Sequence, residues 1–414
     1  MGRTIIKSLG IVLSVTVLLA MLGLVAGCGE EKQEGTTEIR IAILTDFTGP
    51  AAYAAQQHTN GFMDYFSMLE EKDPIPGAKI KVLTYDQRSD FARVIPGYLW
   101  LKGQGAVLVH PVSGDDFVML ESRFEQDHIP GINAYLQESS PNFPWTFAQG
   151  VSSPMETEVA LQWIMDTWDY DGKGRPPKIG HQGWARESSV KYQAGIDRML
   201  EWYPDKFEFV SFQSSPVGNT SWAVEVGKLQ DCDYIYLSMV GAMLGSFTKE
   251  ARARGLQCSF LSASISYTGF WPVVRSSVPA DELYGCYFFH FVPWWTQDIL
   301  YVNSLREAIL KYHPDEAEDY MAATGPVAGW GIGMFVAQAI RDAVERVGAE
   351  NVDGTALRDA LAELDMTVEG WDYPWRFSED HHLLLRDMKA YQWSVAENVW
   401  ECVSGSYIPH SLAG

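Results

Sequence analysis

The sequence predicts an α/β fold built from two doubly wound, parallel-sheet lobes joined by a hinge. Three observations support this prediction. The 414-residue chain is longer than a single hydrophobic core usually serves. Short β-rich runs alternate with helical patterns, which is typical of βαβ units and parallel sheets. The alternation restarts near residue 155 and helical patterns return after Pro293, which indicates that the chain crosses between two bodies.

In the first body, β-rich runs and helical patterns follow one another in turn. Strands are expected at residues 39–44, 79–85, 106–110 and 129–134. Helices are expected at residues 52–69, 91–103 and 115–126. Pro96 falls inside the second of these helices, where we expect it to start or kink the helix.

The second body repeats this order without repeating the sequence. Strands are expected at residues 178–182, 207–212, 234–238, 259–263 and 283–291, and helices at residues 155–168, 187–202, 221–230 and 243–254. Further helices are expected at residues 299–312, 328–347 and 354–364, before a β-rich tail at residues 389–395 and 399–403. Ligands bind at the carboxyl ends of such strands, so we expect a cleft between the lobes.

The first residues form a secretory leader. Arg3 and Lys7 accompany an apolar run at residues 9–25, which is shorter than the roughly 20 residues of a spanning helix. The run ends in Leu24-Val25-Ala26-Gly27-Cys28, which resembles a bacterial lipobox. That resemblance implies cleavage after residue 27 and lipid on Cys28, which would hold the protein to the membrane. Residues 28–37 would form the tether. An uncleaved anchor helix is the alternative.

Charge and cysteine content narrow the class of protein. A formal charge of −22 argues against nucleic acid as a partner, because phosphates attract Lys and Arg faces. Secretion permits disulfides, but the four remaining cysteines show no CxxC spacing. Both bridges and free thiols stay open for these four, which are Cys232, Cys258, Cys286 and Cys402.

Several segments occur in a familiar order along the mature chain. They include Thr45-Asp46-Phe47-Thr48-Gly49-Pro50, Tyr85-Asp86, His110-Pro111-Val112-Ser113-Gly114, Ile129-Pro130-Gly131-Ile132-Asn133 and Cys232-Asp233-Tyr234-Ile235-Tyr236. This order resembles the type I periplasmic binding proteins, and within them the branched-chain amino acid and amide branch that serves ABC importers.

The resemblance implies a hinged, flytrap-like protein. Lobe 1 would comprise residues 38–150 plus 292–366, and lobe 2 residues 151–291 plus 367–414. Closure would bury a small-molecule ligand, and a membrane permease would recognise the closed state. We expect a lipid-anchored, extracytoplasmic monomer without cofactor, metal or catalytic residues.

The ligand site of lobe 1 is expected in the loops after its strands. Ser113 and Gly114 open a helix whose backbone N–H groups suit a carboxylate, as the resemblance implies. Ser113 would alternatively be a plain N-cap. Tyr53 follows the first strand, where relatives place an aromatic residue, or it covers the core. The polar tips of three residues near the end of the fourth strand could contact the ligand or support the loop backbone, and the sequence does not decide between these roles. These residues are Asn133, Tyr135 and Gln137.

Lobe 2 is expected to close over the ligand with Trp184, which follows its first strand. Relatives carry an aromatic residue at the position of Val240, and a glutamate that holds the ligand ammonium at the position of Ser264. An ammonium without a carboxylate partner is strongly disfavoured out of water. We therefore expect an amide, a carboxylic acid or an aromatic ligand in place of a standard branched-chain amino acid.

Two other classes of function are compared with the sequence. For an enzyme, Gly329-Trp330-Gly331-Ile332-Gly333 lies in a helical stretch instead of after a strand, so it does not fit a dinucleotide loop. Asp380-His381-His382 has no spaced partner and fits a polar turn better than a metal site. A sensing lipoprotein of the same fold, which signals to a receptor instead of a permease, stays open.

Overall fold

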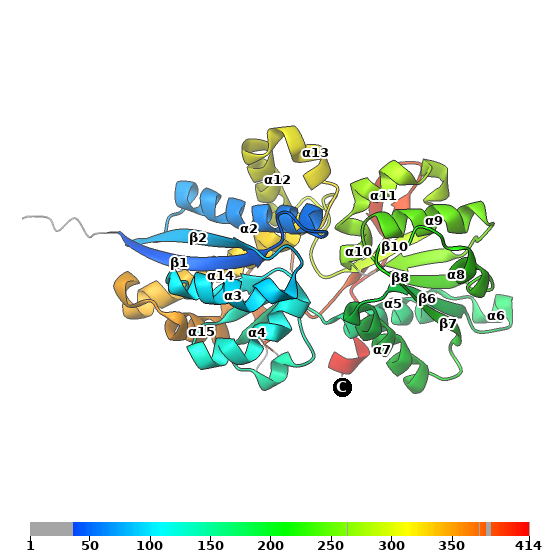
Figure 1. The fold of residues 1–414 in the computed structure, drawn as a ribbon, viewed down its shortest axis with the longest axis horizontal. Coiled ribbons are helices and arrows are strands. Elements are labelled where there is room, and N and C mark those ends of the chain that lie inside the picture. Colours follow the sequence, from blue (N-terminus) through cyan, green and yellow to red (C-terminus); the bar gives the residue numbers. More distant parts are fainter. Residues whose placement is uncertain (1–35, 263, 372, 378–381, 414) are drawn as a thin grey trace, which may run out of the picture.

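The computed structural model describes residues 36–262, 264–371, 373–377 and 382–413. Two α/β lobes lie side by side, each around its own sheet, so the predicted fold class is confirmed (Figure 1). The leader, Cys28 and most of the tether lie outside the described residues. Within the described part of the chain, no helix combines the length and apolar character needed to cross a bilayer.

The first sheet has five parallel strands in the order β2-β1-β3-β4-β5. They are β1 (Thr37–Thr45), β2 (Ala78–Asp86), β3 (Val109–Pro111), β4 (Gly131–Tyr135) and β5 (Thr146–Gly150). Apolar side chains of β1 are buried on both faces, with Ile41 and Ile43 on one and Ala42 and Leu44 on the other. A strand buried on both faces is typical of a parallel sheet covered by helices.

Helices cover both faces of this sheet. One face packs against α2 (Ala52–Lys72) and α14 (Gly325–Val347), and the other against α3 (Phe91–Gly103) and α4 (Gly114–Asp127). The remaining helices of this lobe are η1 (Ser140–Asn142), α12 (Leu300–Tyr312), η3 (Pro314–Glu316), α13 (Ala317–Tyr320), η4 (Ala349–Asn351) and α15 (Gly354–Ala362). Pro96 lies within the continuous helix α3 and does not start it.

The glycine-rich segment 329–333 lies inside α14, where it allows a close helix contact. A Cβ atom on Gly329 would lie 2.0 Å from the carbonyl oxygen of His58 in α2. A Cβ atom on Gly61 would lie 2.2 Å from the carbonyl oxygen of Pro326. These glycines therefore serve packing between α2 and α14, which agrees with the argument against a dinucleotide loop.

The second sheet has seven strands in the order β14-β13-β10-β9-β8-β6-β7. Its five-strand body is parallel, and the tail strands β13 and β14 join antiparallel. The strands are β6 (Lys178–Trp184), β7 (Glu208–Ser215), β8 (Tyr234–Ser238), β9 (Ser259–Ser262), β10 (Cys286–His290), β13 (Lys389–Ser394) and β14 (Val399–Cys402). The helices are α5 (Ser153–Thr167), α6 (Tyr170–Lys173), α7 (Glu187–Trp202), α8 (Ala223–Lys228), α9 (Ala242–Ala253), α10 (Ser264–Thr268), α11 (Trp271–Ser277), η2 (Ala280–Glu282) and η5 (His410–Leu412).

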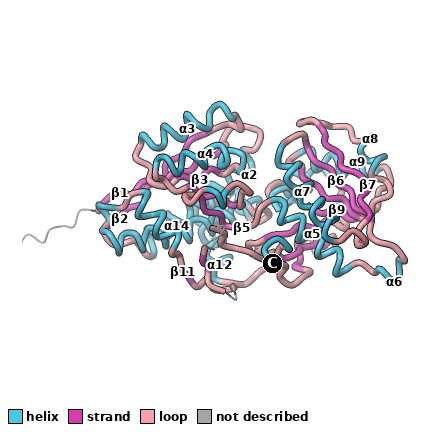
Figure 2. The backbone as a smooth tube through the Cα atoms, turned by 90° about the horizontal axis from the view of Figure 1, so that it is seen from below, coloured by secondary structure: helices cyan, strands magenta, loops and turns pink. Residues whose placement is uncertain are grey.

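The chain passes between the lobes after β5, after β10 and before β13. Figure 2 shows β5 and α5 on either side of the first crossing. Before its last crossing it forms the small hairpin of β11 (Asp365–Met366) and β12 (Trp375–Arg376). The Leu384 N–H then donates to the Ala148 carbonyl of β5 at 3.0 Å, and the Leu385 N–H to Gln149 at 2.8 Å. The first lobe thus extends to Leu385, beyond the boundary at residue 366 expected from the sequence.

All four cysteines that the structure describes are free thiols. Cys232, Cys258 and Cys286 are buried, and Cys402 is exposed. Burial raises the pKa of both the Cys232 and the Cys258 thiol to about 12, so both are protonated at neutral pH. The thiol alternative left open by the sequence is therefore the one observed.

Candidate functional site

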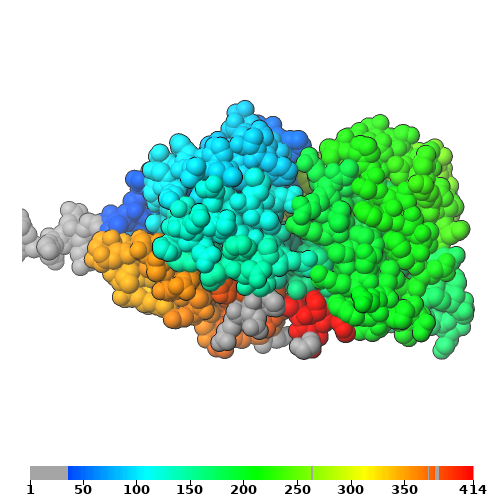
Figure 3. Space-filling model, turned by 60° about the horizontal axis from the view of Figure 1, so that its bottom comes forward, coloured from blue at the N-terminus to red at the C-terminus, as the bar shows by residue number. Residues whose placement is uncertain are grey.

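The expected site residues lie where the carboxyl ends of the two parallel sheets face each other. The space-filling view shows the furrow between the blue and cyan first lobe and the green second lobe (Figure 3). Parallel strands place the loops after their carboxyl ends at one edge of a sheet, which is where ligands bind in such folds. We call this region the interlobe face, and side chains from both lobes meet in it.

Two carboxylates fix the loop that follows β1 by accepting hydrogen bonds from its backbone. Buried Asp46 accepts the backbone N–H groups of Thr48 at 3.1 Å and Ala51 at 3.1 Å. Asp86, at the end of β2, accepts the Phe47 N–H at 2.9 Å. The loop therefore leads into α2 in a fixed path and sets the position of Tyr53 in its first turn.

Tyr53 reaches toward the second lobe. Its ring lies 6.2 Å, centroid to centroid, from Phe270, which precedes α11. Burial raises the pKa of Tyr53 to about 12, and its buried hydroxyl, near the Gln57 side chain, makes no hydrogen bond of standard geometry in the described chain. An unpartnered buried hydroxyl is costly, so this group is available to a polar ligand atom.

Ser113 forms the N-cap of α4, and its Oγ accepts the Asp116 N–H at 3.4 Å. Gly114, the next residue, lies against Gln137, because a Cβ there would be 2.7 Å from the Gln137 Nε2. Asn133 uses both ends of its amide within the lobe: Nδ2 donates to the Pro111 carbonyl at 2.8 Å, and Oδ1 accepts the Tyr135 N–H at 2.9 Å. These contacts are the loop-support roles left open by the sequence.

The start of α4 is acidic, which bears on what it can bind. Asp115 and Asp116 occupy its first turn. Burial, then the nearby carboxylates of Asp115 and Asp46, raise the pKa of Asp116 to about 7. One oxygen of Asp116 is buried without a partner. A ligand carboxylate at this helix start would therefore meet negative charge as well as backbone N–H groups.

On the second lobe, Trp184 ends β6 and is half-buried. Its indole N–H donates to the Ser188 Oγ at 3.2 Å, and the Arg186 guanidinium lies 5.7 Å from its ring centroid. Val240 is half-buried in the turn between β8 and α9. Both residues follow strand ends of this sheet, on the edge that faces the first lobe.

Tyr135 and Ser264 meet directly across the interlobe face. The Tyr135 hydroxyl lies 2.8 Å from the Ser264 Oγ, which in turn donates to the Glu156 Oε1 at 2.7 Å. Tyr135 ends β4 of the first lobe, whereas Ser264 begins α10 and Glu156 lies in the first turn of α5. We call these three residues the interlobe relay.

The Glu156 carboxyl is buried, and burial raises its pKa to about 7. Its second oxygen, Oε2, makes no hydrogen bond of standard geometry within the described chain, and the Tyr192 hydroxyl and the Ser264 N–H near the carboxyl partly offset the effect of burial on its pKa. This carboxyl corrects one step of the sequence argument, which took Ser264 to mean that no carboxylate lies at this point. Glu156 lies behind Ser264, but its oxygens are covered and do not face the furrow.

Further contacts cross the interlobe face on either side of the relay. The Lys191 ammonium of α7 lies 3.4 Å from the Gln137 Oε1 and 3.8 Å from Asp115. The Thr268 hydroxyl of α10 lies 2.8 Å from that of Thr324, just before α14. Of the expected site residues, the structure joins Tyr135 to Ser264, Asn133 and Gln137, and Gly114 to Gln137.

Comparison with known proteins identifies the family. A model of the periplasmic binding protein family matches residues 38–398, which is most of the chain. The chain belongs to the periplasmic binding protein family. As a member, this protein is a solute-binding protein of the extracytoplasmic space. The search of curated protein sequences gave no match.

Solved structures share the fold of this periplasmic binding protein. A branched-chain amino acid ABC transporter protein from Thermus thermophilus superposes with a TM-score of 0.79 at 14% identity, over 91% of this chain and 98% of its own. A fatty acid ABC transporter substrate-binding protein from Thermomonospora curvata gives 0.75 at 19% identity, over 90% and 93%. A branched-chain amino acid substrate-binding protein from Streptococcus pneumoniae gives 0.72 at 14% identity, over 89% and 100%. At these identities the likeness shows the fold alone.

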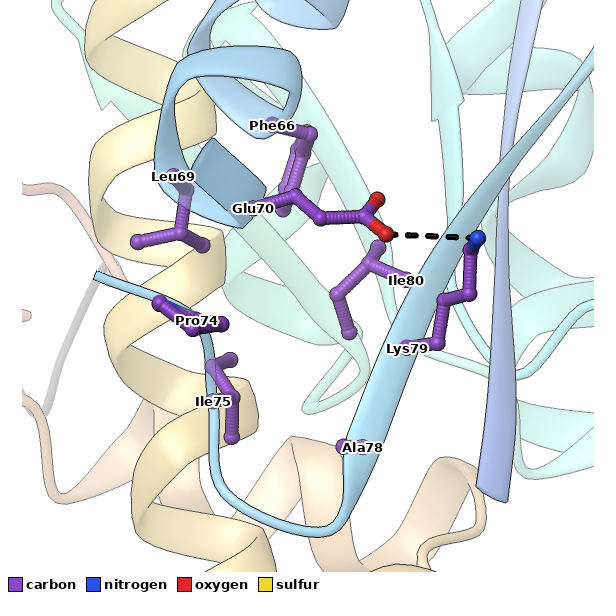
Figure 4. Close-up of a pocket in the computed structure, with 8 residues that line it drawn as sticks. All are labelled: Phe66, Leu69, Glu70, Pro74, Ile75, Ala78, Lys79 and Ile80. Carbon is purple, nitrogen blue, oxygen red and sulfur yellow. Dashed lines mark ion pairs between the residues drawn. The ribbon is translucent and has the colours of Figure 1, made fainter. Parts of the chain in front are cut away.

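A small cavity lies at the opposite edge of the first sheet of this periplasmic binding protein (Figure 4). It is lined by Phe66, Ile75 and Ala78 among others, and the Glu70 carboxylate and the Lys79 ammonium, 3.2 Å apart, border it. Its free volume of about 20 Å³ has room for one water molecule. This cavity is too small for a solute, so the interlobe face is the better candidate site.

No group of three or more His, Cys, Asp or Glu side chains suited to a metal occurs in the described ranges. Asp380 and His381 lie outside them. His382 packs its ring on Phe147 with centroids 4.4 Å apart and turns Nδ1 toward the Thr146 carbonyl at 2.9 Å. This histidine holds the last crossing segment against β5.

Glu156, Lys191 and Asp116 were not predicted from the sequence as site residues. Glu156 follows the Ser152-Ser153-Pro154 start of a helix, where an acidic residue usually serves the helix dipole. Its contact with Ser264 spans 108 residues, so no local pattern signals it.

Proposed function

We propose that this protein is a lipid-anchored solute-binding protein that captures a small organic molecule between its lobes and delivers it to an ABC importer. The interlobe relay is the observation that supports this proposal most. Polar side chains of two separate lobes meet there without a covalent tie, as a closing ligand trap requires. The lipid on Cys28 would keep the protein beside its permease.

The ligand is proposed to lack an α-ammonium group, and to be an amide, a carboxylic acid or an aromatic compound. Ser264 presents a hydroxyl where an ammonium would need a carboxylate, and both Glu156 oxygens are covered. Asp115 and Asp116 at the start of α4 favour a neutral group over a carboxylate. Among the three classes, a neutral amide therefore suits the described residues best.

The ligands of the structural neighbours define which compounds must be compared. The Thermus thermophilus structure contains bound valine, and the Thermomonospora curvata protein is a fatty acid transporter component. These two ligand classes differ in the ammonium group that separates the alternatives for this chain. A test panel therefore needs matched pairs that differ only in that group.

Thermal unfolding in the presence of such a panel tests the proposal. The protein beginning after Cys28, which retains every described residue, is mixed with isovaleramide, isovalerate, leucine, benzamide and benzoate. A ligand at 100 times its Kd adds about 2.7 kcal/mol to the free energy of unfolding, which gives a clear rise in Tm.

We expect a rise in Tm with an amide and none with leucine. Ser113→Ala and Tyr53→Phe should reduce that rise, because both residues follow strand ends of the first sheet at the interlobe face. A rise with leucine that is lost in Ser113→Ala would refute the ligand class while leaving the solute-binding role. The absence of any rise across a panel extended to long-chain acids would contradict capture of small organic molecules.

A further inference from the structure

The interlobe relay has a fixed direction of hydrogen bonding. Ser264 has a single hydroxyl proton, which it donates to the Glu156 Oε1 at 2.7 Å. A proton on Oε2 leaves Oε1 as this acceptor in the neutral carboxyl too, and the Tyr135 hydroxyl, 2.8 Å from the same Oγ, is then the donor to Ser264. The relay therefore runs from the first lobe to a carboxyl of the second, and it ends at Glu156.

Lobe separation would break one link of the relay and keep the other. Tyr135 belongs to β4 of the first sheet, so opening carries it away from Ser264. Ser264 and Glu156 both belong to the second lobe and stay together. In the open arrangement, water can reach the place that the Tyr135 ring occupies, and the Glu156 carboxyl is then closer to solvent.

Closure thus seals the Glu156 carboxyl from water. With the relay joining the two lobes, Glu156 is 1% exposed, and Oε2 makes no hydrogen bond of standard geometry in the described chain, although the Tyr192 hydroxyl and the Ser264 N–H lie near the carboxyl. An unpaired buried charge is far more costly than a neutral polar group with one missing hydrogen bond. The closed arrangement therefore favours the protonated carboxyl.

The groups that surround Glu156 supply no counter-charge. Three tyrosines lie near the carboxyl, namely Tyr192 of α7, Tyr236 of β8 and Tyr135 of β4. Ser264 of α10 hydrogen-bonds to it. Burial raises the pKa of each of these tyrosines above its ordinary value, so they are neutral across the physiological range. Two further charged or titratable groups from elements packed on α5 are otherwise engaged: Arg198 of α7 with Glu138 and Glu158, and His410 of η5 with Tyr203. His290 of β10 is buried and neutral, because burial lowers its pKa to about 3.

We propose that Glu156 is a positioning residue that acts through Ser264 and Tyr135 and links closure of the two lobes to uptake of one proton. This inference deepens the proposed function and rests on it, since it concerns how the same interlobe face closes. Glu156 itself contacts no ligand in this scheme. It holds the Ser264 hydroxyl toward Tyr135 when neutral, and opposes burial of the site when charged.

The pH dependence has a definite sign. Burial raises the pKa of Glu156 from 4.5 to about 7 in the closed arrangement, whereas hydration in the open one brings it back toward its ordinary value. Closure therefore takes up a proton between these two values, and the closed-to-open ratio falls about tenfold per pH unit as pH rises through that window. Above pH 7 the ratio levels off.

Small-angle X-ray scattering of the ligand-free protein at pH 5, 6, 7 and 8 tests the proposal. The wild-type radius of gyration should increase from pH 5 to pH 8 as the lobes separate. Glu156→Gln, which is neutral at every pH, should stay compact throughout. Tyr135→Phe removes the donor and should be expanded already at pH 5. Infrared spectroscopy of the wild type should show a protonated carboxyl band that disappears near pH 7.

Asp64→Asn is the matched control. Asp64 is also a buried carboxyl with a raised pKa, about 6, but it hydrogen-bonds His313 of the first lobe. This variant should keep the wild-type scattering profile. The proposal is overturned by a wild-type radius of gyration that is constant from pH 5 to 8, or by a Glu156→Gln protein that retains the wild-type profile and so assigns the titration to Asp116 or another group. None of these measurements uses a ligand, so their failure is separate from failure of the ligand panel.

Discussion

At the scale of single residues, Arg252 shows how the second lobe keeps a buried cation. Its guanidinium lies between the rings of Phe260 and Tyr284, 4.1 and 4.0 Å from their centroids. Its hydrogen bonds within the described chain go to main-chain carbonyls, those of Leu256, Cys258, Glu282 and Tyr284. Arginine can do this because its planar fork presents several donors at once.

Replacing Arg252 with lysine should destabilise the protein by about 2–4 kcal/mol. The ammonium cannot reach all of these carbonyls or stack between two rings, so buried acceptors lose their partners. Urea unfolding followed by tryptophan fluorescence measures the change. Arg254→Lys is the control, because Arg254 is exposed and pairs with Glu250, and it should change stability by less than about 0.5 kcal/mol. Equal effects of the two substitutions would contradict the role given to Arg252.

At the scale of elements, the contact between α2 and α14 joins two parts of the first lobe that are far apart in the sequence. The α14 helix comes from residues 325–347, far from α2 in sequence, yet it packs tightly on α2 beside the sheet. Small residues make this approach possible. The helix contact therefore depends on glycine at specific positions more than on the size of apolar side chains.

Gly329→Ala should destabilise the first lobe by about 1–3 kcal/mol. The new methyl group would lie 2.0 Å from the His58 carbonyl oxygen, so the two helices must move apart. Gly227→Ala in α8 is the matched control, because nothing lies within 4 Å of a Cβ there. It should stabilise by about 0.5–1 kcal/mol through helix propensity. Calorimetry of both variants checks the pair, and a Gly329→Ala protein as stable as wild type would refute the close contact.

The elements also show how far the sequence could predict this fold. The helix at residues 187–202 and the strand at 234–238 match their predicted ranges, because their apolar spacing is regular over the whole element. Strand β5 was missed, since Thr-Phe-Ala-Gln-Gly has few β-branched residues and its partners come from distant segments. The helix α10 was also missed, because five residues are too few to show a helical repeat of apolar positions.

The candidate site could also be predicted only in part from the sequence. Positions after strand ends could be predicted, because topology places them at one edge. Their partners could not, since the contacts of Ser264 with Tyr135 and Glu156 span 129 and 108 residues. Asn133 illustrates the limit, because its polar side chain at a strand end supports the loop with both ends of its amide.

At the scale of the whole molecule, the proposed anchor predicts where the protein is found in the cell. Cys28→Ser removes the thiol that would take lipid, so the protein should move from the membrane pellet to the soluble fraction on ultracentrifugation. Cys402→Ser is the control, because Cys402 is an exposed free thiol in the tail and should leave membrane association unchanged. Cys28→Ser protein that stays in the pellet would favour the uncleaved anchor helix instead.

Each lobe is assembled from separated stretches of chain. The first sheet ends at Gly150, but its covering helix α14 and the segment up to Leu385 come more than 170 residues later. The second sheet is completed only by β13 and β14 at the tail. A chain that emerges gradually, from a ribosome or through a narrow export pore, therefore has no finished lobe until its last few dozen residues are free. Such a chain stays unfolded during passage and completes both lobes late. Truncation before Leu385 should therefore disrupt both lobes, whereas loss of β13 and β14 alone should disrupt the second lobe.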